Sequence, residues 1–355
     1  MGISASLGSS ALLPAGLGFR NKLINGDMRI NQRGAGTLTG SGSNQWAVDS
    51  WRIWNGTGTV TFQQSTTAPA GFSNSLLATV TATGSYGTNG YTQMQTKIEG
   101  LNCTDLNWGT ANAKPVRVSF WVRASVAGTY SCQVRNGASN RSYAATFTIN
   151  AANTWEYETL LIQGDTSGTW LTTNGVGLDL IINLGLGTDY ETATPYTWVA
   201  GDFGATSACV DLAANAGATF YITGVQLEQN YQSTPFEQRP IGVELALCQR
   251  YYQRLTYQTT NYFAIGQVYP TNNAYAVIDL PTTLRTAPTS ITVSGTTFAL
   301  DSSGVGRGIT VAMANATTYN VGINATGSFN LTNGHAALLA FSTAPNYIEL
   351  NGTEL

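Results

Sequence analysis

The chain has 355 residues, of which 10% are charged and 43% are hydrophobic, and its formal net charge is −3. Soluble proteins average about 25% charged residues, so the surface of this protein must rely on neutral hydroxyl and amide side chains. Lysine occurs only at Lys22, Lys97 and Lys114. A protein that follows nucleic-acid phosphates needs clustered lysine and arginine, so nucleic acid is excluded as a partner. No stretch approaches the ~20 consecutive apolar residues of a membrane span, so we expect no membrane insertion.

Residues 1–18 are apolar and rich in small side chains. They lack the positively charged start and the long apolar centre of a signal peptide. We expect these residues to form an N-terminal arm that becomes ordered against a partner.

Residues 19–236 are dominated by alternating apolar and polar side chains, the pattern of half-buried β-strands. In Val116–Arg123, for example, every second residue is valine or phenylalanine. Short clusters of glycine, asparagine and serine separate such runs. Many short strands with turns of this kind predict an all-β fold, a jelly-roll β-sandwich. The further strands expected here are Trp51–Trp54, Val60–Gln63, Tyr130–Arg135, Tyr143–Ile149, Trp155–Leu161, Gly177–Leu184 and Ala218–Glu228.

One segment, Pro240–Arg254, changes to helical spacing. Proline is tolerated in the first turn of a helix, and apolar residues then recur three or four positions apart. We therefore predict a connecting helix within residues 237–255. Either this helix fills the seam between two β-domains, or its stripe of Leu247 and Tyr251 lines a contact between copies of the chain.

Residues 256–355 return to short alternating runs and predict a second, smaller β-domain, so the whole chain is expected to be all-β with one joining helix. The strands expected in this domain are Tyr262–Gly266, Ala274–Leu280, Ser290–Val293, Ile309–Ala312, Tyr319–Ala325 and Ala336–Ser342.

Seven stretches of the sequence carry a further signal because they occur together and in a fixed order. They are NKLINGDMRINQRG at Asn21–Gly34, VDSWRIW at Val48–Trp54, WGTANAKPVRVSFWVRAS at Trp108–Ser125, NRSYAATFTINAANTWEYETLLIQGDTSGTW at Asn140–Trp170, GATFYITGVQLEQN at Gly217–Asn230, TPFEQRPIGVELALCQRYYQR at Thr234–Arg254 and LPTTLRTAPTSITVSG at Leu280–Gly295. Together these blocks resemble a module of bacteriophage tail-fibre and related virion proteins.

The resemblance implies that the large domain is a jelly roll similar to carbohydrate-binding modules. Such modules often open with an N-G-D-F-E-like strand and close with a V-x-L-E-like strand, whose counterparts here are Asn25–Met28 and Val225–Glu228. They often hold a structural calcium with acidic residues near these two places. This chain has Arg29 and Thr223 there, and calcium prefers ligand sets that include carboxylates. We therefore expect no metal and no other cofactor.

The resemblance also implies a role. The protein would be a virion structural protein, a tail fibre or baseplate-attached appendage that contributes to recognition of glycans on the host surface. It would be assembled in the host cytoplasm, form a homotrimer and contact other virion proteins through residues 1–18, with bacterial surface polysaccharide as its external partner. The alternatives are a capsid decoration or cement protein of the same fold and a polysaccharide depolymerase.

A glycan-binding surface needs aromatic rings beside hydroxyl and amide groups. Trp51, Trp54, Trp121 and Trp155 lie inside strand patterns, and we interpret them as residues that pack in the core or on a sheet. Aromatic residues in glycine- and threonine-rich segments are better placed in exposed loops. The glycan-binding candidates are Tyr86, Tyr91, Trp170, Tyr190, Tyr196 and Trp198.

Nothing in the sequence identifies a catalytic residue. A glycosidase needs two carboxylates at a set separation, and the spacing of the 19 acidic residues singles out no pair. The single histidine, His335, and the four widely spaced cysteines form no zinc motif. We expect the cysteines to be free thiols. The sequence therefore predicts a protein that is not an enzyme.

Overall fold

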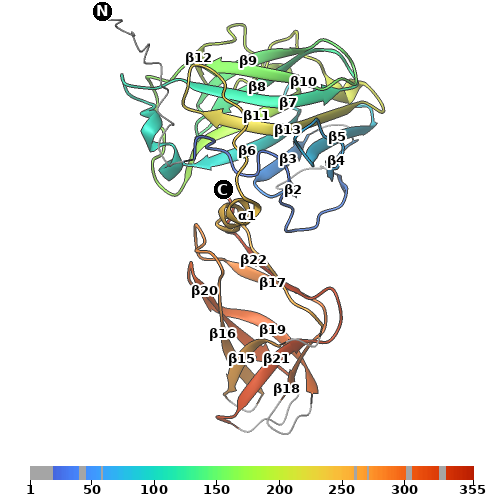
Figure 1. Cartoon of the computed structure of the whole chain (residues 1–355), viewed down its shortest axis with the longest axis vertical. Helices are drawn as coiled ribbons and strands as arrows, with labels where there is room; N and C mark the ends of the chain where they lie inside the picture. Colours follow the sequence, from blue (N-terminus) through green and yellow to red (C-terminus); the bar gives the residue numbers. More distant parts are fainter. Residues whose placement is uncertain are drawn as a thin grey trace, which may run out of the picture.

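The computed structural model describes residues 19–39, 45–56, 59–259, 262–269, 272–300, 306–327 and 333–355. Within these residues it confirms the predicted fold class, because two large antiparallel sheets form a sandwich, followed by one α-helix and smaller C-terminal sheets (Figure 1). The predicted N-terminal arm, residues 1–18, lies outside the described residues.

Each sheet of the sandwich mixes strands from distant parts of the chain, as the crossing connections of a jelly roll require. The six-stranded sheet consists, in spatial order, of β1 (Leu38–Thr39), β4 (Thr59–Ser65), β5 (Ser75–Ala82), β13 (Thr219–Glu228), β7 (Val116–Ala124) and β10 (Glu156–Ile162). The seven-stranded sheet consists of β12 (Trp198–Ala200), β9 (Arg141–Ile149), β8 (Gly128–Arg135), β11 (Val176–Leu186), β6 (Tyr91–Glu99), β3 (Trp51–Asn55) and β2 (Gln45–Val48).

The main hydrophobic core lies between these two sheets. In β7, the alternating residues Val116, Val118, Phe120 and Val122 are all buried, as the period of two predicts. Phe120 packs edge-on against Phe147 of β9 in the facing sheet, with the ring centroids 5.0 Å apart. Burying one such side chain contributes roughly 1.5–3 kcal/mol, so this core holds the sandwich together.

The C-terminal strands form a closed barrel and a separate three-stranded sheet in the part of the chain that the structure describes. A second hydrophobic cluster, which includes Val268, Ile323 and Phe341, packs inside them. The barrel consists of β15 (Tyr262–Val268), β16 (Asn273–Asp279), β20 (Asn320–Thr326), β19 (Gly306–Ala316), β18 (Thr297–Leu300) and β21 (Ala336–Phe341), and the small sheet consists of β14 (Arg254–Thr256), β22 (Tyr347–Asn351) and β17 (Ser290–Ser294).

Helix α1 spans Ile241–Gln249 and lies between the sandwich and the C-terminal strands (Figure 1). It begins after Pro240, as predicted, but ends before the predicted Arg254. The reason is that Arg254–Thr256 pairs with β22 as strand β14. The ladder hydrogen bonds of that strand take the place of another helical turn.

Just after α1, Arg250 and Tyr251 bind the carboxylate of Glu99 at the end of β6. The guanidinium donates two hydrogen bonds of 2.8 and 2.7 Å, and the tyrosine hydroxyl donates one of 2.8 Å. Burial alone would raise the pKa of Glu99, but the hydrogen bonds from Arg250 and Tyr251 and the charge of Arg250 outweigh it, so this pKa lies below its usual value. The contact favours the interpretation in which the helix fills the seam between the β-domains.

The position of Tyr251 corrects the prediction that it lines a contact between copies of the chain. Tyr251 is only 7% exposed, and its hydroxyl is bound within the chain. The helical spacing that suggested a contact stripe therefore reflects docking onto β6. Leu247 is half-buried, and its role in such a contact stays a prediction.

Replacing Glu99 with alanine should lower the free energy of unfolding by about 2 kcal/mol, a typical value for hydrogen bonds to a charged group. Urea denaturation at neutral pH measures this loss. Because the pKa of Glu99 is lowered in the folded state, its contribution should be present above its usual pKa of 4.5 and disappear as the pH falls through the lower folded-state value.

Asp105→Ala provides the matched control for this measurement. Asp105 is exposed and pairs with Lys22 at 2.7 Å on the surface. Surface pairs contribute about 0–1 kcal/mol, so this variant should remain close to the original stability. An equally small loss from Glu99→Ala would contradict docking of the helix through Glu99.

Candidate functional site

The outer face of the seven-stranded sheet carries polar and charged side chains in rows that cross the strands. On β6, Gln93, Gln95 and Lys97 point to this face, because the alternating residues Met94 and Ile98 belong to the core. The strand register places their neighbours in three rows: Trp54–Gln93–Asn183, Arg52–Gln95–Ile181 and Lys97–Asp179–Arg135.

Residues 187–205, which follow β11 and include β12, return across part of this face. Asn183 of β11 donates a hydrogen bond of 3.0 Å to the carbonyl oxygen of Gly204, and Gln133 of β8 donates one of 2.6 Å to the carboxylate of Asp202. This covering segment leaves a groove of about 240 Å³ over β3 and β6. The groove is lined by Arg52, Trp54, Tyr91, Gln93, Gln95, Arg135, Tyr190 and Asp202.

Three half-buried aromatic rings, Trp54, Tyr91 and Tyr190, form one side of the groove, and we call them the aromatic trio. Trp54 stacks on Tyr91 with ring centroids 5.5 Å apart and an interplanar angle of 27°. Tyr190, from the covering segment, meets Tyr91 edge-on, also at 5.5 Å. Burial raises the pKa of Tyr91, so its hydroxyl remains a hydrogen-bond donor at neutral pH.

A hydrogen-bond network fixes the polar floor of the groove. Arg135 donates from Nε to Asp179 at 3.0 Å and from Nη1 to Asp202, and Gln95 donates to the same Asp179 oxygen at 2.9 Å. Gln93 is held by Asn183 at 2.9 Å. Asp179 is only 2% exposed, and burial raises its pKa although the charge of Arg135 opposes the shift. The floor is therefore a set of side chains that are already oriented.

The structure brings two of the six predicted glycan-binding candidates, Tyr91 and Tyr190, into this groove. Tyr86 is only 6% exposed and belongs to the core, so it is wrong as a glycan-binding candidate. Tyr196 is 50% exposed and its hydroxyl bonds to Thr146, outside the residues that line the groove.

The candidates Trp170 and Trp198 pack against each other and against Trp108 at ring-centroid distances of 4.6 to 5.3 Å. Their indole nitrogens donate to groups of the protein itself, Trp170 to Asp165 and Trp198 to the carbonyl oxygen of Gln163. This cluster packs as part of the sandwich core and its border, and none of its three rings lines the groove.

Sequence reasoning missed Trp54 and Arg52 as groove residues. We interpreted Trp51 and Trp54 alike as packing residues, yet an odd number of positions separates them, so they lie on opposite faces of β3. Trp51 is fully buried in the core, whereas Trp54 lines the groove. In β3, Arg52 and Trp54 alternate with Trp51 and Ile53, and this alternation is the sequence signal that places Arg52 and Trp54 on the outer face.

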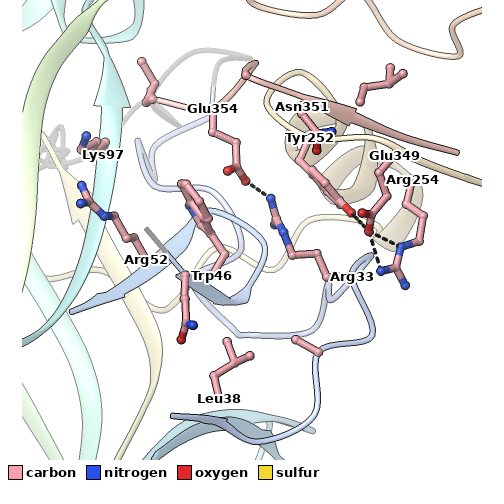
Figure 2. A pocket seen from close by; sticks show the side chains of 15 residues that line it. Arg33, Leu38, Trp46, Arg52, Lys97, Tyr252, Arg254, Glu349, Asn351 and Glu354 are labelled. Carbon is pink, nitrogen blue, oxygen red and sulfur yellow. Dashed lines mark hydrogen bonds and ion pairs between the residues drawn. The ribbon is translucent and has the colours of Figure 1, made fainter. Parts of the chain in front are cut away.

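A second, larger cavity of about 780 Å³ lies beside the groove, where the sandwich meets β22, and we call it the seam cavity (Figure 2). The guanidinium of Arg33 lies 3.5 Å from the ring centroid of Tyr252 and 5.1 Å from that of Trp46. It also pairs with Glu354, whose pKa burial raises to about 7. Arg52 lines both the groove and the seam cavity.

In the described part of the chain, no group of three or more histidine, cysteine, aspartate or glutamate side chains could hold a metal ion. At the place where the resembled modules often bind calcium, the buried carboxylate of Asp27 pairs with Arg29. All four cysteines are free. No helix among the described residues is long and apolar enough to cross a membrane.

No protein family and no curated protein matches the sequence. Among solved structures, the chain has distant similarity to the enzymatically active domain of tailspike protein 4 of bacteriophage CBA120, at 14% identity and a TM-score of 0.34, over 59% of this chain and 22% of that chain. It is also similar to the carbohydrate-binding module TmCBM61 in complex with β-1,4-galactotriose, at 12% identity and a TM-score of 0.30, over 60% of this chain and 100% of that one. A putative sugar binding protein from Bacteroides thetaiotaomicron matches at 10% identity and a TM-score of 0.34, over 59% and 100% of the two chains.

Proposed function

We propose that this protein binds glycans in the groove of the seven-stranded sheet. The observation that carries the proposal is the aromatic trio beside a floor of fixed amide and guanidinium groups. A sugar ring presents an apolar C–H face that can stack on an aromatic ring, and its hydroxyls match amide donors and acceptors. Trp54 would supply the stacking face, and Gln93 and Gln95 the hydrogen bonds.

The fixed floor favours this function because binding is weakened by every side chain that must first be ordered. Immobilising one flexible side chain costs about 0.5–1.5 kcal/mol. Gln93, Gln95 and Arg135 already hold one orientation through their bonds to Asn183, Asp179 and Asp202. A ligand would therefore meet an arrangement that needs little rearrangement.

Replacing Trp54 with alanine should weaken glycan binding at least about tenfold, which corresponds to ~1.4 kcal/mol. The reason is that the stacking face is lost while the polar floor remains. Titration calorimetry with a bacterial surface polysaccharide that binds the unmodified protein measures the change.

Trp121→Ala is the matched control for the loss of an indole ring. Trp121 lies on the six-stranded sheet, 5.3 Å from the ring centroid of Tyr157 and away from the groove. This variant should bind as the unmodified protein does. Loss of binding in Trp121→Ala, with Trp54→Ala unaffected, would place the site on the other sheet and contradict the proposal.

We also propose that the groove binds its ligand without cleaving it. Glycosidases need a carboxylic acid and a carboxylate that both reach the sugar. Of the two carboxylates at the groove, Asp179 is buried, and both oxygens of Asp202 are bound by Gln133 and Arg135. The chain length of a bound polysaccharide, followed by size-exclusion chromatography, should stay constant during incubation, and release of oligosaccharides would contradict this proposal.

The blocks of sequence that resemble phage tail-fibre proteins support a setting for this activity. We propose that the protein is a component of a phage virion, carried on the tail as a fibre or baseplate appendage, where glycan binding contributes to host attachment. Added soluble protein should then reduce adsorption of the phage to its host, and Trp54→Ala protein should reduce it less. Gold-labelled antibodies that decorate the capsid shell and leave the tail bare would instead indicate a decoration protein.

A further inference from the structure

Arg52 and Lys97 differ from the other cations around the groove and the seam cavity because neither has an ion-pair partner among the described residues. Arg33, Arg135 and Arg254 each pair with a carboxylate on this surface. The side chain of Lys97 also makes no hydrogen bond to any residue that the structure describes, and Nε of Arg52 is buried without a hydrogen-bond partner. Among the described residues, two half-buried positive charges thus have no ion-pair partner at contact distance, although the charge of Asp179, opposite Lys97 on β11, stabilises both.

The two side chains are neighbours on the sheet. Arg52 of β3 lies opposite Gln95 of β6, and Lys97 is the next residue of β6 on the same face. Such diagonal neighbours lie about 7–8 Å apart, within reach of long side chains. Figure 2 shows both along one wall of the seam cavity, and Arg52 continues into the groove.

Two nearby side-chain carboxylates make their closest contacts with other cations. Asp179 accepts from Arg135 and Gln95, and Glu354 pairs with Arg33. Burial lowers the pKa of both Arg52 and Lys97, and the charge of Arg52 lowers that of Lys97 further, although Asp179 opposes this. Placing two like charges in this half-buried position destabilises the protein unless an anion lies between them.

We propose that the ligand of the groove is an acidic saccharide whose anionic group binds between Arg52 and Lys97 while an adjacent sugar ring stacks on Trp54. This inference rests on the proposed function and specifies the class of glycan. The guanidinium of Arg52 lies over the ring of Trp54, 4.7 Å from its centroid, so the anion site adjoins the stacking site directly. A neutral saccharide would leave both cations without an ion-pair partner among the described residues.

The experiment compares acidic bacterial polysaccharides with their carboxyl-reduced forms, which keep the same sugar sequence without the charge. The full chain should bind at least one acidic form about tenfold or more tighter than its reduced form, as expected for hydrogen bonds to a charged group. Arg52→Gln and Lys97→Gln should each lose most of this preference, measured as the ratio of the affinities for the acidic and the reduced form. Rising salt should weaken binding of the acidic form alone.

Lys22→Gln removes the same charge at a surface position paired with Asp105 and should keep the full preference. Thermal unfolding separates binding from a structural role. Since Lys97 has no ion-pair partner among the described residues, Lys97→Gln should unfold at the same temperature as the unmodified protein or higher, whereas a structural role predicts a lower temperature.

The outcomes distinguish this inference from the function on which it rests. If the acidic and reduced forms bind equally well, and Trp54→Ala weakens the binding of both, the anion site is overturned and the proposed glycan binding stands. Absence of binding to either form of every polysaccharide would overturn the proposed function together with the anion site. A preference that survives both Arg52→Gln and Lys97→Gln would place the anion elsewhere and overturn the inference.

Discussion

Ion pairs between arginines and buried carboxylates add specific contacts to the packing of the two hydrophobic cores. The carboxylates of Glu99, Asp165 and Asp179 are almost fully buried, and in each case an arginine reaches them from a more exposed position. Breaking such a pair strongly destabilises a protein, because it leaves a buried charge without a partner. The fold is therefore restricted to arrangements that keep each pair. This restriction docks the chain after α1 onto β6, ties the loop after β10 to β9, and orients Arg135 in the groove.

The strands on which this arrangement depends differ in how well their sequences reveal them. The alternation in β7 was unmistakable, because valine and phenylalanine alternate there with polar residues. β6 was not predicted, since Thr92 and Thr96 occupy buried positions that apolar residues usually fill. That strand supplies much of the groove, so a weak pattern in one strand concealed the site. The helix was predicted too long because its apolar spacing continues through Tyr251 and Tyr252, which lie between the end of α1 and β14.

The candidate residues show why a loop assignment from composition is a poor guide to exposure. Tyr86 and Tyr91 lie in similar glycine- and threonine-rich sequence, yet Tyr86 enters the core and Tyr91 lines the groove. The difference arises from tertiary packing, which local sequence does not encode. For Trp54 the sequence did carry the information, because alternate residues of β3 lie on opposite faces of the sheet and Trp54 alternates with the buried Trp51 and Ile53. The part of that outer face that stays open depends on the covering segment, residues 187–205. This segment brings Tyr190 and Asp202 over the sheet.

The distribution of partners around the groove gives it a direction. At one end, Arg135 forms ion pairs with two carboxylates, which neutralise its charge within the protein. At the other end, neither Arg52 nor Lys97 has an ion-pair partner among the described residues. The aromatic trio lies beside this row of charges. A chain of sugars with one acidic residue could satisfy stacking and charge in a single orientation, so the asymmetry of the ion pairs would select the direction in which a glycan lies as well as its charge.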